Sequence, residues 1–392
     1  MSVSKDDYYS INKVVLSLVG QWPYQAPWQK FILSVNVILG ISSQMYLQTR
    51  ALIAAWTNWD LVIELLSAIL IQSLCLLKFL NCLFNARKMK ILLVQMQDAW
   101  KLKLTDKERE ILHIYALEGN KFSWVYVVTM YVVTFLYATL PHIPTLVAFV
   151  SNKNETIQGA LLFDVEQVVD REKYYYVILI HSFYTTFLLI TLPASADSMF
   201  LVFVQYACAK FSLIGQQLET IQDDNIDVNI HVPRSEDKVY KKIINSIIDH
   251  KNALKFAELL ASTYSSSFLF QTGLNVAVIT FNGVQAVICL DGRKEEALRF
   301  CITALTVSFH FLFLSLPCQK LLDHSLQIND SIYCSNWYAT SIKSRRLLEL
   351  MLMRSRIPSQ ITAGKIYMMS LENFGSAMQA SMSYFTVLTS IR

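Results

Sequence analysis

The sequence predicts an all-α membrane protein with seven transmembrane helices, a cytoplasmic N-terminus and an extracellular C-terminus. Of its 392 residues, 54% are hydrophobic and only 16% are charged, whereas a soluble domain carries about 25% charged residues. Seven stretches supply the roughly 20 mostly apolar residues that cross a bilayer. They are residues 31–49, 61–84, 122–150, 174–207, 257–290, 298–317 and 366–391.

The seven stretches differ in character. The third runs from Phe122 to Val150 without a charge and contains two prolines near its end. The fourth and fifth are longer than a bilayer requires and their excess is more polar, so we expect both helices to project beyond the membrane. The last stretch is the weakest, which leaves counts of six or eight spans open. Residues 1–30 lack a clean apolar core, so the first span is expected to act as its own insertion signal.

The distribution of basic residues gives the orientation, because short cytoplasmic loops retain Lys and Arg. Segments 1–30, 85–121, 208–256 and 318–365 hold 25 of the 34 basic residues, and the alternate loops hold only 8. Lys78, inside the second span, is expected to extend its charge to the inner surface. The sequon at Asn154 falls in a predicted outer loop, where it would be a glycosylation site.

Residues 333–357 read as an amphipathic helix in the predicted cytoplasmic region 318–365. Leu347, Leu348, Met351 and Leu352 cluster on it, and Arg345, Arg346 and Arg354 surround them. A helix lying on the membrane surface has this pattern, and so does a helix that packs against copies of itself beneath the bilayer. The residues alone do not separate the two.

No pattern typical of an enzyme, a metal site or a cofactor site is present. The sequence has no P-loop, GxGxxG, HExxH or GxSxG motif, and its histidines lack the spacing of metal ligands. The net charge of +4 is too small and scattered to indicate a nucleic-acid partner.

A few polar residues lie in or beside the spans. Asp197 is expected near the inner interface. His142, His181 and His310 lie in or beside spans, where hydrogen bonding to a neighbouring helix is the simpler interpretation. Cys289 and Cys301 flank a short outer loop, so pairing between them stays open.

Aromatic and small polar side chains recur at helical spacing in the outer halves of three spans. Such faces either pack together or enclose a small lipophilic ligand. The candidate pocket walls are Tyr131, Thr134, Phe135 and Ala138 in the third span, Tyr176, Phe183 and Phe187 in the fourth, and Thr306, Phe309, His310 and Phe313 in the sixth.

The last span carries small residues on one face, at Ser376, Ala380 and Ser383, and the same face continues to Val387 and Ile391. Small residues at this spacing commonly let membrane helices pack closely. Several copies around an axis would instead form a pore with a modestly polar lining and a hydrophobic ring near its outer mouth. Such a ring can gate by dewetting.

The C-terminal third resembles the insect odorant receptor family. The residues that carry the resemblance are Trp337-Tyr338 after Cys334, then Ala363-Gly364-Lys365, Leu371, Phe374 and the closing run Ser383-Tyr384-Phe385-Thr386-Val387-Leu388. The run SYFTVL close to the end is the most specific of these. Upstream of residue 300, the number of spans and the orientation match the family, but no motif does.

The resemblance implies that residues 1–392 form one subunit of an odorant-gated, non-selective cation channel in the plasma membrane of an olfactory sensory neuron. It implies a tetramer with an obligate co-receptor, and a small volatile ligand held within the outer half of spans 31–317. Residues 318–365 would form the cytoplasmic anchor, and 366–392 the pore-lining span, with Val387 and Ile391 as the gate. The chain lacks the co-receptor's long insertion between the fourth and fifth spans, so it resembles a tuning subunit.

A seven-span G-protein-coupled chemoreceptor is the alternative class. That class predicts an extracellular N-terminus, and the sequence has neither a DRY-like triplet after the third span nor an NPxxY motif near the end of the seventh. A gustatory-type relative would end in a TYxxxxxQF-like pattern, which is missing as well. A transporter would show paired repeats or matching broken helices, and neither is evident.

Overall fold

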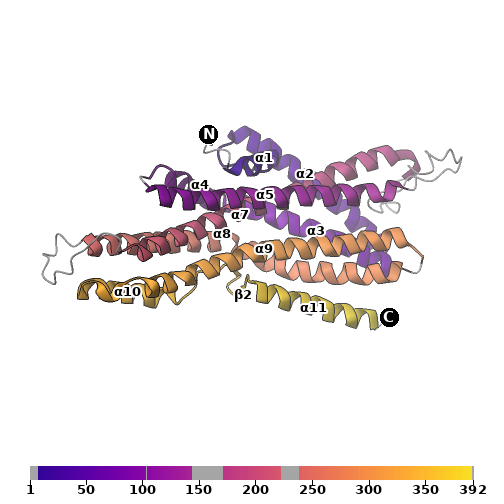
Figure 1. The fold of residues 1–392 in the computed structure, drawn as a ribbon. Coiled ribbons are helices and arrows are strands. Elements are labelled where there is room, and N and C mark those ends of the chain that lie inside the picture. The colour runs from indigo at the N-terminus through magenta and orange to yellow at the C-terminus, as the bar shows by residue number, and fades with distance from the viewer. Residues whose placement is uncertain (1–7, 103, 144–170, 222–237, 291, 391–392) are drawn as a thin grey trace.

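The structure, a computed structural model, describes residues 8–102, 104–143, 171–221, 238–290 and 292–390. Long helices run side by side in an elongated bundle (Figure 1). The helices are α1 (Ser10–Leu18), α2 (Pro27–Ala54), α3 (Trp59–Phe84), α4 (Ala86–Ala99), α5 (Asp106–Thr139), α7 (Arg171–Glu219), α8 (Lys238–Cys289), α9 (Lys294–Cys334), α10 (Ile342–Ser355) and α11 (Leu371–Ser390). The described part also contains the short 3-10 helices η2 (Leu140–His142) and η3 (Trp337–Ala339), and a hairpin of β1 (Thr362–Ala363) and β2 (Tyr367–Met368).

Each predicted span overlaps a helix, which confirms the predicted all-α membrane fold. The predicted start of the seventh span at 366 is too early, because residues 367–368 form strand β2 and α11 begins at Leu371. By length and composition, α2, α3, α5, α7, α8 and α9 are long and apolar enough to cross a membrane. The seventh span corresponds to α11, which is not among these six but has 20 residues, enough for about 30 Å at the rise of an α-helix. Residues 144–150 of the third predicted span lie outside the described residues.

Helix α7 is the centre of the bundle. It packs against α1, α2, α3, α4, α5, α8 and α9, and every residue from Thr191 to Ala209 is buried. Small residues at Ala194, Ser195 and Ala196 let these neighbours approach its backbone closely. The 49 residues of α7 and the 52 of α8 exceed the roughly 20 that a bilayer needs, as the sequence predicted.

Local signals explain where two of the helices begin. The Asn58 side chain accepts hydrogen bonds from the backbone N–H groups of Asp60 and Leu61 at the start of α3. Thr105 and Glu108 form a reciprocal capping box at the start of α5. The capping box starts α5 well before the predicted span at 122, so the helix continues outside the apolar run.

The N-terminal segment is packed into the bundle. Tyr8, Tyr9, Val15 and Leu16 are buried, and α1 contacts α5 and α7. The Asn12 side chain, 0% exposed, donates to Ser123 Oγ of α5 over 3.1 Å. The sequence assigned residues 1–30 only to the cytoplasmic side and gave no sign of this packing.

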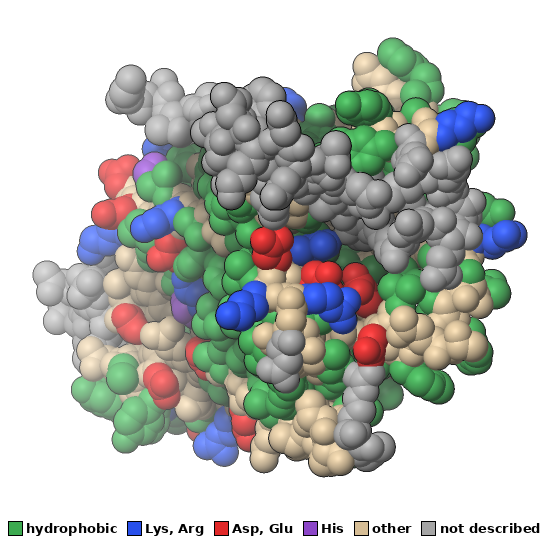
Figure 2. Space-filling model, turned by 90° about the vertical axis from the view of Figure 1, so that its right-hand side faces the viewer, with side chains coloured by type: hydrophobic (Ala, Val, Ile, Leu, Met, Phe, Trp, Pro, Cys, Tyr) green, Lys and Arg blue, Asp and Glu red, His purple; other side chains and the backbone are tan. Residues whose placement is uncertain are grey.

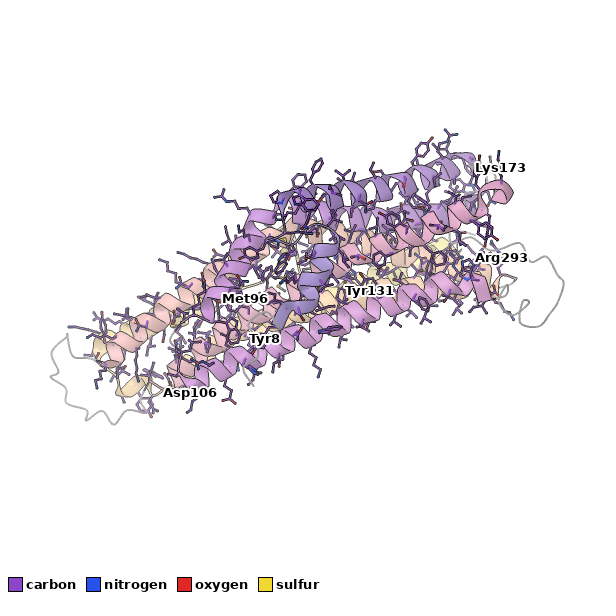
Figure 3. All side chains as sticks on the ribbon, turned by 90° about the horizontal axis from the view of Figure 1, so that it is seen from above. Tyr8, Met96, Asp106, Tyr131, Lys173 and Arg293 are labelled. Carbon is purple, nitrogen blue, oxygen red and sulfur yellow. The ribbon has the colours of Figure 1, made fainter. Side chains whose placement is uncertain are left out.

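The two ends of the bundle differ in what they carry. Asp106, at the start of α5, lies at one end, and Lys173 and Arg293 lie at the other (Figure 3). The C-terminal end of α11 is at the same end as the α8–α9 connection (Figure 1). Acidic and basic side chains gather on this end face (Figure 2), where Arg293 pairs with Glu296 at 2.9 Å. The distribution of Lys and Arg assigns this end to the outside.

The predicted amphipathic helix at 333–357 is too long. Helix α9 ends at Cys334, the chain turns through η3, and α10 begins only after Ser341, whose side chain accepts the backbone N–H of Ser344. The serine at the start of α10 interrupts the pattern, because its hydroxyl favours a helix N-cap over a helix interior. Helix α10 packs against α8 and α9, with Leu348 and Met351 buried.

A tight hairpin joins α10 to α11. Gly364 and Lys365 have φ values of 62° and 61°, and the Gly364 N–H donates to the Ser265 backbone carbonyl of α8 over 3.0 Å. A Cβ on Gly364 would lie 2.6 Å from Leu269 Cδ2. Both the left-handed backbone and the close approach of α8 therefore require glycine at this position.

We expect Gly364→Ala to lower the melting temperature of the purified protein by several degrees, because the new methyl group overlaps Leu269 in a left-handed backbone. The expected loss is about 1–3 kcal/mol. Gly273→Ala is the matched control, since Gly273 lies in α8 with open space around it and alanine favours the helix there. Thermal unfolding in detergent measures both. An unchanged melting temperature for Gly364→Ala would contradict the steric argument.

Candidate functional site

A buried ion pair lies in the middle of the bundle. The carboxylate of Asp197 on α7 accepts from Lys78 Nζ on α3, with 2.6 Å to each oxygen. Both side chains are only 2% exposed. Within a membrane, a charged side chain is stable only where another group of the protein replaces its lost hydration. Lys78 meets this condition by pairing with Asp197.

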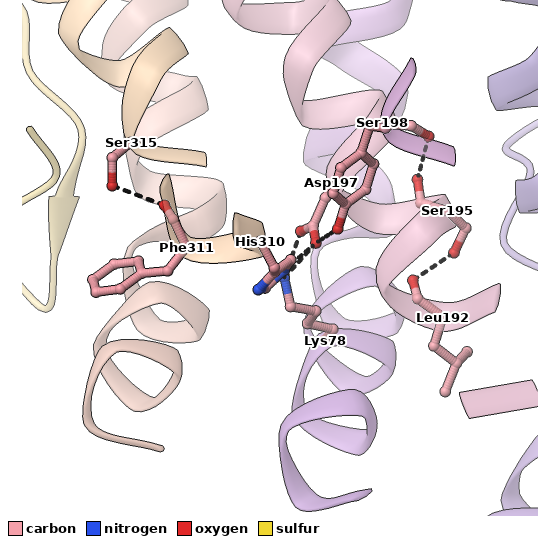
Figure 4. Close-up of polar contacts among 9 residues, drawn as sticks. Lys78, Leu192, Ser195, Asp197, Ser198, His310, Phe311 and Ser315 are labelled. Carbon is pink, nitrogen blue, oxygen red and sulfur yellow. Dashed lines mark hydrogen bonds and ion pairs between the residues drawn. The ribbon is translucent and has the colours of Figure 1, made fainter. Parts of the chain in front are cut away.

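Two further side chains complete the cluster around Asp197 (Figure 4). The Tyr126 hydroxyl of α5 donates to Asp197 Oδ2 over 2.8 Å. His310 Nε2 of α9 lies 2.9 Å from the same oxygen, and because a carboxylate only accepts, Nε2 is the donor. We call Lys78, Tyr126, Asp197 and His310 the tetrad. It links α3, α5, α7 and α9 by hydrogen bonds to one carboxylate.

The tetrad corrects one expectation from the sequence. Lys78 does not extend its charge to a surface, because its side chain is 2% exposed and pairs with the buried Asp197. Two of the histidines do hydrogen-bond to neighbouring helices: His310 to Asp197, and His181 to Ser43 of α2, over 2.8 Å.

A cavity of about 190 Å³ lies beside the tetrad and shares His310 with it. Five helices line it, and every lining residue falls within a predicted membrane span. The residues are Ala68, Ile71, Gln72, Leu74 and Cys75 of α3; Met130, Val133, Thr134 and Tyr137 of α5; Thr186, Leu189, Ile190 and Pro193 of α7; Asn275 and Val278 of α8; and Ile302, Thr303, Thr306, Val307 and His310 of α9. The wall is mainly apolar, as a site for a small organic molecule requires.

Three of the sequence-predicted pocket residues line this cavity: Thr134, Thr306 and His310. The others lie elsewhere. Phe135 and Tyr176 are 67% and 76% exposed on the outside of the bundle, and Phe183, Phe187 and Phe309 are also exposed. Ala138 and Phe313 are buried, and Tyr131 hydrogen-bonds to Thr191 over 2.7 Å.

Two amides in the cavity wall were not identified from the sequence. Gln72 and Asn275 are 1% and 0% exposed. Each is an amide in a mainly apolar span, and that was the available signal, because membrane helices place polar side chains toward the bundle interior.

Arg299 contacts one residue of the cavity wall. Its guanidinium donates to the Tyr137 hydroxyl over 3.1 Å and lies 5.0 Å from the centre of the Tyr137 ring. Tyr137 itself lines the cavity.

Helix α11 has one packed and one open face. Ala377 and Ser381 are buried, the Ser381 carbonyl accepts from Thr280 Oγ1 of α8 over 3.3 Å, and the Phe385 ring lies against Gly283. The predicted pore face is on the other side. Ser376, Ser383 and Val387 are exposed and Ala380 is half-buried. Ile391 lies outside the described residues.

A second cavity, of about 200 Å³, lies between α1, α4, α5 and α7. Its lining side chains are engaged with one another: Tyr8 stacks on Trp100 at 5.1 Å, and the Gln97 amide donates to Tyr9 over 2.9 Å. At its edge, a hydrogen bond to Asp98 raises the pKa of Lys101. The membrane cavity, whose wall includes amide atoms without a partner, is the better candidate site.

The remaining sequence-predicted sites are placed as follows. Asn154 lies outside the described residues. Cys289 and Cys301 are free thiols. Among the residues that the structure describes, no group of three or more His, Cys, Asp and Glu side chains is arranged to hold a metal ion.

We expect Asp197→Asn to destabilise the receptor by about 3–5 kcal/mol, because it leaves the Lys78 charge buried without its partner. The double variant Lys78→Met, Asp197→Leu should recover part of the loss, since it removes both charges. Asp98→Asn is the control, because the Lys101–Asp98 pair is exposed and should matter little. Thermal unfolding in detergent measures all three, and equal stability of Asp197→Asn and Asp98→Asn would contradict the role given to the tetrad.

Comparisons with known proteins agree with this architecture. The family model described as 7tm odorant receptor matches residues 58–382. Odorant receptor 59b of Drosophila melanogaster is 25% identical over 172 residues, which is 44% of this chain and 42% of the relative. Odorant receptor 10 of Aedes albopictus is 26% identical over 200 residues, 49% of each chain. The chain thus spans about half the length of these curated relatives.

The fold has a close counterpart among solved structures. The insect olfactory receptor OR5 from Machilis hrabei, in complex with eugenol, superposes with a TM-score of 0.80 over 98% of both chains. Its sequence identity of 15% makes this a likeness of fold. The family match covers most of the chain and identifies a receptor rather than an enzyme. We conclude that the chain belongs to the odorant receptor family of seven-helix membrane proteins.

Proposed function

We propose that this protein is the ligand-recognising subunit of an odorant-gated, non-selective cation channel. The observation that carries the proposal is the mainly apolar cavity among five membrane helices, next to the tetrad. A small volatile molecule of mostly apolar character suits such a wall. The eugenol complex of the structurally similar receptor supports a small organic ligand.

Helix α11 is the proposed pore element. Its exposed face carries Ser376, Ser383 and Val387, with Ala380 half-buried beside them, so copies of this face around an axis would line an ion path. Val387 and Ile391 would form its hydrophobic gate, because an apolar ring closes a narrow pore by excluding water.

Helix α8 offers a direct link between ligand and pore. Asn275 and Val278 line the cavity, and within two turns of the same helix Thr280 and Gly283 contact α11. A ligand that prefers one position of α8 would thereby favour one position of α11. Binding then shifts a closed–open equilibrium, to the extent that the ligand binds the open state more tightly.

Assembly is proposed to occur through the cytoplasmic end. Helix α10 buries Leu348 and Met351 against its own chain but leaves Leu350 and Met353 more than 60% exposed. An exposed apolar face of this kind suits contact with other subunits. We assign that contact to the anchor of a tetramer with the odorant co-receptor, in the plasma membrane of an olfactory sensory neuron.

The proposal is tested by expressing the chain with and without the co-receptor and recording whole-cell currents during application of an odorant panel. We expect cation currents only from the pair, and we expect them to persist when GDPβS in the pipette blocks G-protein signalling. Cells with the co-receptor alone are the control. Absence of current from a pair shown to assemble at the surface, or its loss with GDPβS, would overturn the proposal.

The gate assignment predicts a change in the closed state. Val387→Ser should raise basal current at least about twofold or alter ion selectivity, because a polar ring is wetted more easily than an apolar one. Val387→Ile keeps the ring apolar and is the matched control. Unchanged basal current and selectivity in Val387→Ser, at equal surface expression, would remove Val387 from the gate.

A further inference from the structure

The cavity contains amide groups that have no partner in the protein. Neither Nδ2 nor Oδ1 of Asn275 has a hydrogen-bond partner, and neither does Oε1 of Gln72. The Gln72 Nε2 group is already used, since it donates to Gln48 Oε1 over 2.8 Å. Burial removes these atoms from bulk water, and a buried polar atom without a partner costs free energy. Both side chains line the cavity, so the missing partner would come from its contents.

The packing of α3 against α8 brings the two amides to the same level. The helices run antiparallel, with Asn282 Nδ2 donating to Ser67 Oγ over 2.6 Å and Gln285 Nε2 donating to the Asp60 carbonyl over 2.5 Å. In an antiparallel pair, rising residue numbers on α3 lie beside falling residue numbers on α8. Starting from the Ser67–Asn282 contact, Gln72 therefore lies opposite Asn275. The two amides therefore lie at one level of the cavity wall on two neighbouring helices, and their unpartnered atoms are buried in that wall.

The rest of the wall determines how a ligand would lie. Around the amides the cavity is lined by aliphatic side chains, including Ile71, Val133, Leu189 and Val278. An apolar body fits this space, and a polar group on it has one favourable location, beside Gln72 and Asn275. His310 also lines the cavity, but its Nε2 is committed to the tetrad.

We propose that Asn275 and Gln72 recognise a hydroxyl group, and that the cavity selects small alcohols or phenols. A hydroxyl both donates and accepts: its hydrogen would go to an amide oxygen, and its oxygen would accept from Asn275 Nδ2. An ether or a carbonyl compound only accepts, so both amide oxygens stay unpaired. A hydrocarbon satisfies none of the three atoms. The order of preference is therefore alcohol, then ether or carbonyl, then hydrocarbon.

This assignment rests on the proposed function for its physiological meaning, and direct binding tests it separately. Purified receptor is mixed with octanol or phenethyl alcohol, with the methyl ether of each, and with octane or ethylbenzene. The ligand-induced rise in melting temperature reports binding. We expect the alcohols to bind at least about tenfold more tightly than their ethers, as in sites built to bond a hydroxyl.

The variant that tests the assignment is Asn275→Leu, which keeps the side-chain size and removes the amide. It should weaken the preference for alcohol over ether, because of the two amide oxygens only Gln72 Oε1 is left to accept the hydroxyl hydrogen. Binding of the hydrocarbon should persist or strengthen, which also shows that the variant is folded. Gln271→Leu is the matched control. Gln271 is one turn away on α8, is 2% exposed and also has an unpartnered amide, but it does not line the cavity.

The same ligands are then applied to cells that express the chain with the co-receptor. A hydroxyl preference in both binding and current supports both proposals, and binding preference without current overturns the channel function alone. Equal binding of alcohols and ethers by the wild type overturns the hydroxyl site. So does a preference that is undiminished in Asn275→Leu, or one that is reduced equally in Gln271→Leu.

Discussion

The carboxylate of Asp197 is the constraint on which the centre of this receptor depends. A charge buried this deeply in the bundle must be paired and hydrogen-bonded, and the three groups that meet this need come from three other helices. Because the contacts are directional, they fix the rotation of α3, α5 and α9 about α7 far more narrowly than apolar packing alone would. The ligand cavity is the space left between these oriented helices.

The sequence predicted the helices well and their mutual contacts poorly. Long apolar runs and the bias of Lys and Arg are local signals, so the seven spans and their orientation could be read directly. The Lys78–Asp197 pair joins residues 119 positions apart. Each of the two looked like an interfacial charge when its span was considered alone. The start of α10 was missed for a similar reason, since the apolar periodicity continued through Ser341 while the local hydrogen bonding of the serine ended it.

At the candidate site, too, the sequence predicted local features but not the contacts between helices. Helical periodicity identified which residues share a face, and Thr134, Thr306 and His310 do line the cavity. It did not say whether that face meets lipid or the bundle interior, and Phe135 and Tyr176 meet the outside. In a membrane both environments favour aromatic side chains, so composition cannot separate them. Polar residues distinguish the lipid-facing surface from the bundle interior better, because an amide side chain is disfavoured in contact with lipid. Gln72 and Asn275 were the more informative positions in the sequence.

Two helices line the cavity and also pack against α11. In α8, Asn275 lines the cavity, and Thr280 and Gly283 contact α11. In α9, His310 lines the cavity, and the adjacent Phe311 packs on Phe374 of α11. In the proposed channel, a mutation in α8 or α9 that alters ligand preference would therefore also shift the balance between closed and open states, whereas one in α5 would act on preference more independently. New odour sensitivities should consequently evolve most readily through α5.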